Sequence, residues 1–222
     1  MVETKNEDVF SDLVRATNSQ TRVEETQFLS LKPIVKRIEQ YFNTYEGHEG
    51  RIYYERRDRQ YVGRGVPVVR IFSLNIATKC VAAMFLTRPD LAYRYPKRMY
   101  ELFSKEIFSD NTKEIVFYTS CLALYRLHLY VASADIPQNM RKYKWHILVL
   151  VGAIISGKKI PKLNSKAMEE YCQKIIDVIS KPGSSALAPF VQAVEIMNSI
   201  DDINDDSLKK QTVMAEMLRE IS

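Results

Sequence analysis

Leu13–Phe42 has the sequence LVRATNSQTRVEETQFLSLKPIVKRIEQYF and carries the densest run of polar side chains in the protein. Within it, residues 15–21 (RATNSQT) are seven small or polar residues, six of which have hydrogen-bonding side chains. Asn, Ser and Thr side chains compete with the backbone for hydrogen bonds, so such a run favours turns and helix caps. Pro33 and the apolar residues that follow it at helical spacing then predict an amphipathic helix.

The polar run at residues 15–21 has two interpretations. In the first, Arg15, Thr17, Asn18 and Gln20 form a binding cluster for a ligand, a phosphate or a partner segment, since Arg offers a fixed fork of donors and Asn and Gln offer donors and acceptors. In the second, these side chains only cap helices and tie a loop to its neighbours. Composition alone favours the second interpretation, because local capping is what these residues usually do.

A second polar segment, RIYYERRDRQY, follows at residues 51–61. Arg51–Glu55 is rich in Ile and Tyr and is the best strand candidate in the chain. Side chains alternate along a strand, so Ile52 and Tyr54 are expected on one face and Tyr53 and Glu55 on the other.

From Ser73 onward the chain has the apolar periodicity of helices. The predicted helices run from Ser73 to Leu86, from Pro89 to Phe103 with a break at Pro96, from Glu114 to Ser133, from Pro137 to Ser156, and over residues 166–180, 186–199 and 206–221. The predicted fold class is therefore mainly α, with many helices and at most one short β-element near residues 51–61. A glycine-marked break at residues 63–67 divides the chain into two predicted segments, 1–66 and 67–222.

The apolar run Ile115–Ala134 is long enough to cross a membrane. However, Arg126 and His128 lie inside it, and a central Arg costs about 3 kcal/mol on insertion. The sequence therefore predicts a core helix here.

Composition is that of an ordinary globular chain, with 222 residues, 46% of them hydrophobic and 27% charged. Cys80, Cys121 and Cys172 are odd in number and widely spaced, so neither a disulfide framework nor a Cys-rich metal site is predicted. Each lies in an apolar helical context, which is typical of a buried thiol in a reducing compartment. With no apolar signal-peptide region near Met1, a cytoplasmic location is expected.

The sequence contains no complete catalytic constellation. Its histidines, His48, His128 and His146, are far apart and have no ligand residues at metal-site spacing, so no metal or cofactor is predicted. Glu55 beside Arg56 resembles part of a nuclease centre, but the further carboxylates and Lys that such a centre needs are not visible. A salt-bridged or solvated strand is the preferred interpretation.

The order RATNSQ, then an amphipathic helix, then Tyr54-Glu55-Arg56-Arg57 resembles the abortive-infection phage-resistance (AIPR) family. The resemblance covers roughly the first third of the chain, Val2 to Tyr61. It implies a role in phage defence and marks Tyr54, Glu55, Arg56 and Arg57 as binding candidates. One departure stands out. The family commonly continues into an Arg-Gly turn, whereas this chain has Asp58-Arg59-Gln60, and Arg reaches φ > 0 at greater cost than Gly.

Longer members of that family carry an upstream half with a restriction-endonuclease-like pattern, and none of it precedes Met1. Val2–Thr4 resembles the tail of a strand, so the chain is interpreted as the C-terminal part of a larger protein. The preferred hypothesis is a non-catalytic recognition or scaffold part whose polar run, residues 15–21, docks a ligand or the missing upstream half, or another protein.

Two alternative functions remain open. Residues 67–160 hold 14 basic and 6 acidic side chains, which suits a polyanion, and Tyr93, Tyr95, Tyr143 and Trp145 are interleaved with the basic residues in a way that suits stacking on bases. A nucleic-acid-binding module is therefore the second hypothesis. Its candidate residues are Arg94, Lys97, Arg98, Arg141, Lys142 and Lys144. The third is part of a nuclease whose metal centre lies upstream.

Overall fold

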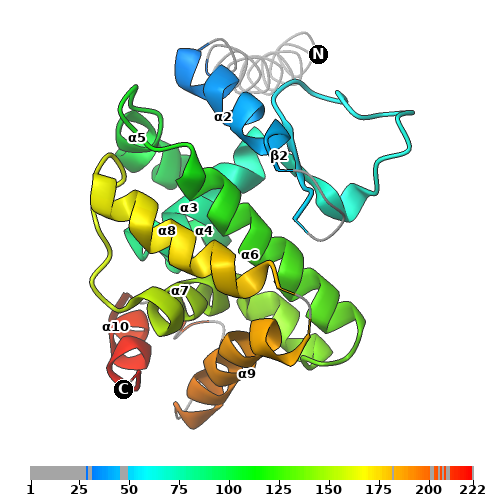
Figure 1. Ribbon diagram of the computed structural model, residues 1–222. Coiled ribbons are helices and arrows are strands. Elements are labelled where there is room, and N and C mark those ends of the chain that lie inside the picture. The colour runs from blue at the N-terminus through cyan, green and yellow to red at the C-terminus, as the bar shows by residue number, and fades with distance from the viewer. Residues whose placement is uncertain are drawn as a thin grey trace, which may run out of the picture.

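Helices packed around a single central helix make up most of the molecule (Figure 1). The computed structural model describes residues 29, 32–45, 50–181, 183–200, 203, 204, 206, 208 and 211–221. The central helix is α6 (Ile115–Ala132), which contacts α3 (Leu74–Leu86) on one side and α8 (Lys166–Ile179) on another. The mainly α fold class predicted from the sequence is confirmed.

α6 is apolar on nearly its whole circumference, because other helices cover it on most sides. Fourteen of its side chains are buried, from Ile115 to Val131. By length and composition α6 could cross a membrane, but 78% of its apolar window is buried inside the protein, as in a core helix. Arg126, the charge inside this run, donates from Nη2 to the carbonyl oxygen of Ser180 at the end of α8, at 2.9 Å.

α7 (Lys144–Ser156) forms a second buried layer against α3, α8 and α9 (Ser184–Ser199). Gly152 permits the close approach of α3, since a Cβ at this position would lie 3.1 Å from the Met84 methyl carbon. The hydroxyl of Tyr171 in α8 donates to the carbonyl oxygens of Gly152 and Gly157, at 3.1 and 2.8 Å. α10 (Gln211–Arg219) covers α7 near the C-terminus.

Local signals set most helix boundaries. Ser73, where the helix was predicted to begin, caps α3 by accepting a hydrogen bond from the Ile76 N–H at 3.4 Å. α4 (Pro89–Arg94) and α5 (Pro96–Ile107) each begin at a proline, also as predicted. The helix predicted from Pro137 instead starts as the 3-10 helix η2 (Gln138–Tyr143), because Tyr143 has φ −94° and ψ 9° and interrupts the α-helical geometry before α7.

A small parallel sheet packs beside the helices. β1 (Tyr53–Glu55) pairs with β2 (Ile71–Ser73) in the register Tyr53–Ile71, Tyr54–Phe72 and Glu55–Ser73. β1 lies in the predicted strand, and Ile52 and Tyr54 are both buried on one face, as the alternation predicts. β2 was not predicted, because three residues are too few to show a period.

Residues 56–70 form the crossover that joins these parallel strands, which cannot be linked by a tight turn. The crossover ends in the 3-10 helix η1 (Val68–Arg70). Gly63 and Gly65 lie in it at φ 74° and 68°. Arg59 also has a positive φ, 58°, a conformation that costs a non-glycine residue about 1–2 kcal/mol. The division of the chain at residue 66, inside this crossover, stays a prediction.

Candidate functional site

Side chains of α2 (Pro33–Asn43) connect the polar segment after β1 to the helical core. Its apolar face buries Ile34, Val35, Ile38 and Phe42, while Glu39 lies on a half-exposed flank. The predicted helix after Pro33 is thus confirmed.

Glu39 is the centre of a hydrogen-bond network between α2 and the segment after β1. Arg56 Nε donates to Glu39 Oε2 at 2.7 Å, and Gln60 Nε2 donates to Glu39 Oε1 at 2.6 Å. The Gln60 amide oxygen accepts the backbone N–H groups of Arg56 and Arg57, at 3.1 and 3.2 Å. We call Glu39, Arg56 and Gln60 the Glu39 bridge. The Arg56 and Glu39 side chains are only 12% and 20% exposed, so solvent screens their attraction less than it screens a surface pair.

An aromatic cluster links α2 and the residues just after it to α6. Tyr118 stacks on Tyr45 with ring centroids 3.6 Å apart and an angle of 12° between the rings, and its edge meets Phe42 at 5.4 Å. The Tyr118 hydroxyl donates to the Gly50 carbonyl oxygen at 2.5 Å. The cluster consists of Tyr41, Phe42, Tyr45, Tyr54 and Tyr118. Burial raises the pKa of the Tyr118 hydroxyl, so it remains a proton donor at neutral pH.

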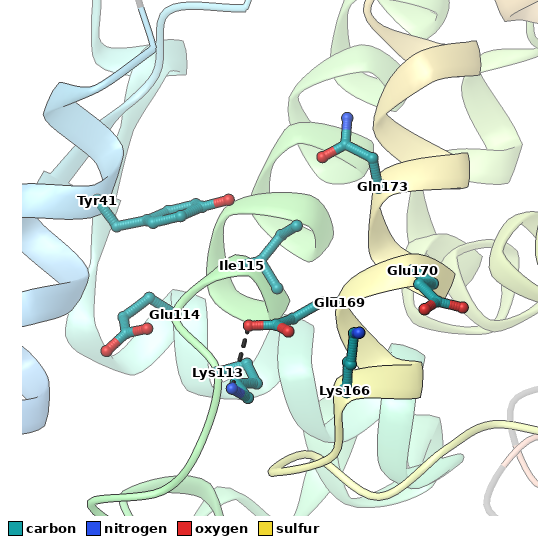
Figure 2. A pocket seen from close by; sticks show the side chains of 8 residues that line it. All are labelled: Tyr41, Lys113, Glu114, Ile115, Lys166, Glu169, Glu170 and Gln173. Atoms are coloured by element: carbon teal, nitrogen blue, oxygen red, sulfur yellow. Dashed lines mark ion pairs between the residues drawn. The ribbon is translucent and has the colours of Figure 1, made fainter.

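A hollow of about 380 Å³ opens beside this cluster, between α2, the start of α6 and α8 (Figure 2). Tyr41 comes from α2, and Gln173 and Glu169 come from α8. Lys113 Nζ, at the start of α6, pairs with Glu169 Oε1 at 3.1 Å across the hollow.

The charges that line the hollow are largely satisfied within the chain. Besides the Lys113–Glu169 pair, Glu114 Oε1 accepts from Arg37 Nε at 2.5 Å. The remaining lining side chains Lys166, Glu170 and Gln173 are exposed on one face of α8. The hollow therefore brings together charges of both signs without forming a nucleophile and base in contact.

The eight predicted binding residues divide into two groups. Arg15, Thr17, Asn18 and Gln20 lie outside the described residues. The other four are placed, and the structure distributes them between the core and the surface.

Tyr54 is 1% exposed, and its hydroxyl has no hydrogen-bond partner among the described residues. Burial raises the pKa of this hydroxyl well above its ordinary value. Arg56 belongs to the Glu39 bridge, Glu55 is half-buried at the end of β1, and Arg57 is exposed. Of these four side chains, Arg57 is therefore the most accessible to a partner.

The six candidate nucleic-acid residues lie on separate elements. Arg94 ends α4 and Lys97 and Arg98 are in α5, whereas Arg141 and Lys142 are in η2 and Lys144 begins α7. Arg94, Lys97 and Arg98 are exposed, and so are the neighbouring Tyr93 and Tyr95, at 37% and 45%. The two groups are separated in the chain by α6.

Two residues of the Glu39 bridge, Glu39 and Gln60, were missed by sequence reasoning. They are 21 residues apart and belong to no recognisable local pattern, so only the fold brings them together. Among the described residues, no group of three His, Cys, Asp or Glu side chains is arranged to hold a metal ion.

One known protein family matches the sequence of this chain. A sequence model of the family described as AIPR protein matches residues 1–211. The chain belongs to the AIPR family. The match extends far beyond the first third of the chain, so the helical part belongs to the family as well. AIPR membership connects the protein with abortive infection, a form of phage defence. No curated protein and no solved structure matches the chain.

Proposed function

We propose that this chain is a non-catalytic recognition part of a phage-defence protein, in which the polar run at residues 15–21 docks a ligand or a partner segment. The observation that carries the proposal is the ion pair between Arg56 Nε and Glu39 Oε2, at 2.7 Å. It joins the second family segment to α2, the helix that follows the polar run. The pair therefore holds the second family segment against a helix that follows the first segment in the chain.

The contacts made by the second segment support a positioning role over a catalytic one. Tyr54 is buried in the aromatic cluster and Arg56 is occupied by Glu39, so neither side chain faces a substrate. A carboxylate that is hydrogen-bonded by both Arg56 and Gln60 is well suited to hold two elements at a fixed angle. Arg57, exposed next to this bridge, is available to extend a recognition surface.

The proposal predicts that the double substitution Arg15→Ala and Asn18→Ala abolishes phage protection by the complete gene product while leaving its thermal unfolding unchanged. The reason is that these side chains would contact the partner and not the core. Plaque counts on cells that express each variant measure protection. The matched control is Lys36→Ala with Gln40→Ala, which removes a cation and an amide from exposed positions of α2. Full protection by the Arg15/Asn18 variant would refute the proposal.

A second candidate function is contact with single-stranded nucleic acid. It is favoured by the α4–α5 corner, where the half-exposed rings of Tyr93 and Tyr95 flank the exposed Arg94 and Lys97. Aromatic rings beside cations are the usual platform for unpaired bases. We expect a gel-shift titration to show binding that falls steeply as salt rises and that weakens in the Tyr95→Ala variant. Absent binding at low salt, or binding that ignores salt, would exclude this function.

A further inference from the structure

The hollow between α2, the start of α6 and α8 has an aromatic wall and an apolar floor (Figure 2). Tyr41 of α2 lies on one side, and Glu169 and Gln173 of α8 lie on the other. Ile115, the first residue of α6, lies between them and is 7% exposed. The volume of about 380 Å³ falls in the range of small-molecule sites, roughly 300–1,000 Å³. The hollow therefore has room for a whole small molecule.

Neighbouring aromatic rings hold Tyr41 in place. Its hydroxyl is hydrogen-bonded to the Tyr45 hydroxyl at 3.0 Å, and Tyr118 meets its ring edge to face with centroids 6.2 Å apart. Tyr41 is half-buried and lines the hollow, so part of its ring is accessible to a ligand. A ring that is already immobilised loses little conformational freedom on binding, and this favours stacking of a planar ligand against it.

Two acceptor oxygens are available on the α8 side of the hollow. Gln173 Nε2 donates to Asp177 Oδ1 at 2.8 Å, one turn further along the helix. This bond sets the orientation of the amide, so Gln173 Oε1 points toward Tyr41 (Figure 2). Glu169 uses Oε1 for Lys113, at 3.1 Å, and its Oε2 accepts no hydrogen bond from the part of the chain that the structure describes. The hollow thus offers acceptors to a ligand that carries hydrogen-bond donors.

The charges around the hollow favour a neutral ligand. Glu114 is paired with Arg37 at 2.5 Å, and Glu169 is paired with Lys113 at 3.1 Å. A cationic ligand would compete with these two bonds for the same carboxylates. An anionic ligand would meet three lining carboxylates, those of Glu114, Glu169 and Glu170, against two lysines. A neutral ligand with donor groups avoids both penalties, because only its polar edge needs to be satisfied.

We propose that the hollow binds a neutral nucleoside whose base carries an exocyclic amino group, as adenosine does. The base stacks against Tyr41 above Ile115, and its amino group donates to Gln173 Oε1. Glu169 Oε2 accepts a ribose hydroxyl. The site uses neither the polar run nor the α4–α5 corner, and it is therefore independent of both functions proposed above.

Equilibrium dialysis of the whole protein with labelled adenosine tests the site directly, and inosine is the matched ligand. Inosine has a carbonyl oxygen where adenosine has the amino group, so it would bring an acceptor against Gln173 Oε1. We expect saturable binding of adenosine at one site and binding of inosine that is weaker by about tenfold or more. No saturable adenosine binding, or equal affinities for the two nucleosides, would overturn the proposal.

Gln173→Leu removes the acceptor from an exposed position of α8 and should leave the fold intact. We expect it to weaken adenosine binding about five- to tenfold and to reduce the preference for adenosine over inosine. The matched control is Gln192→Leu, the same change at an exposed position of α9, and it should bind as the unchanged protein does. An equal loss of affinity in both variants would show that Gln173 does not contact the ligand and would overturn the proposal.

The stacking contact is tested at Tyr41. Tyr41→Leu removes the ring and should weaken adenosine binding about tenfold or more, whereas Tyr41→Phe keeps the ring and should bind nearly as tightly as the unchanged protein. Competition with N-acetylarginine amide tests the chemical class of the ligand. Failure of this cation to displace adenosine supports the neutral site, and displacement at lower concentrations than inosine requires would overturn it in favour of a guanidinium site.

Discussion

Replacing Tyr118 by Ala should lower the free energy of unfolding by about 3–5 kcal/mol, the usual cost of deleting a large buried aromatic side chain. Tyr118 is fully buried, stacks on Tyr45 at 3.6 Å and hydrogen-bonds the Gly50 carbonyl oxygen at 2.5 Å. Its removal leaves a cavity between α2 and α6 and an unpaired carbonyl group. Denaturant unfolding monitored by circular dichroism measures the loss.

Tyr118→Phe is the matched control, because it keeps the stacked ring and removes only the hydroxyl. We expect it to cost about 0.5–1.5 kcal/mol, the net contribution of a typical hydrogen bond, because Gly50 is only half-buried. If Tyr118→Ala were no more destabilising than Tyr118→Phe, the ring contacts to Tyr45 and Phe42 would contribute nothing and the aromatic cluster would not hold α2.

The function of the polar run should respond to the same substitution. α2 is attached to the core by the aromatic cluster at one face and by the Glu39 bridge at its flank. Loosening the first attachment leaves the second. The Tyr118→Ala variant should therefore retain its fold below its unfolding transition and still lose the recognition function proposed for residues 15–21. Loss of phage protection in a variant that is still folded would favour a recognition role, which needs α2 in place, over a role of the helical core alone.

The local parts of the fold were predictable, because their signals are local. Ser73 accepts the N–H three residues ahead, and Pro89 and Pro96 each begin a helix, so neighbouring residues suffice to place α3, α4 and α5. α6 was predictable as a core helix because Arg126 and His128 interrupt an otherwise apolar run. β2 was missed, since its three residues gain their strand geometry from pairing with β1.

The candidate sites were less predictable, because they depend on contacts between distant residues. Nothing in the sequence near Arg56 indicates that Glu39, 17 residues earlier, will accept its hydrogen bond. The excess of basic residues over 67–160 indicated that a polyanion site was plausible in that segment, while the polar run at residues 15–21 stays a prediction.

Acid should destabilise this protein through its buried histidines. His146 in α7 is 3% exposed, and burial lowers its pKa to about 4, although a hydrogen bond with the Leu208 backbone and the charge of Asp90 act in the opposite direction. In the unfolded chain the pKa of a His is about 6.5. Between these two values the unfolded state binds more protons than the folded state. The contribution of His146 is therefore fully present above about pH 6.5 and is lost as the pH falls toward 4.

The expected slope is about 1.4 kcal/mol of unfolding free energy per pH unit for His146, or about 3 kcal/mol over the whole window. Gln at this position is neutral at every pH and can still hydrogen-bond. His146→Gln should therefore lower the slope of unfolding free energy against pH by about 1.4 kcal/mol per pH unit. His128, whose pKa is also about 4, supplies a second and separate contribution. The double variant His128→Gln with His146→Gln should then retain only the slope due to carboxylates. Denaturant unfolding at intervals from pH 7 to 4 measures the unfolding free energy of the unchanged protein, of His146→Gln and of the double variant. Parallel curves for the unchanged protein and His146→Gln would show that His146 is not held neutral in the fold.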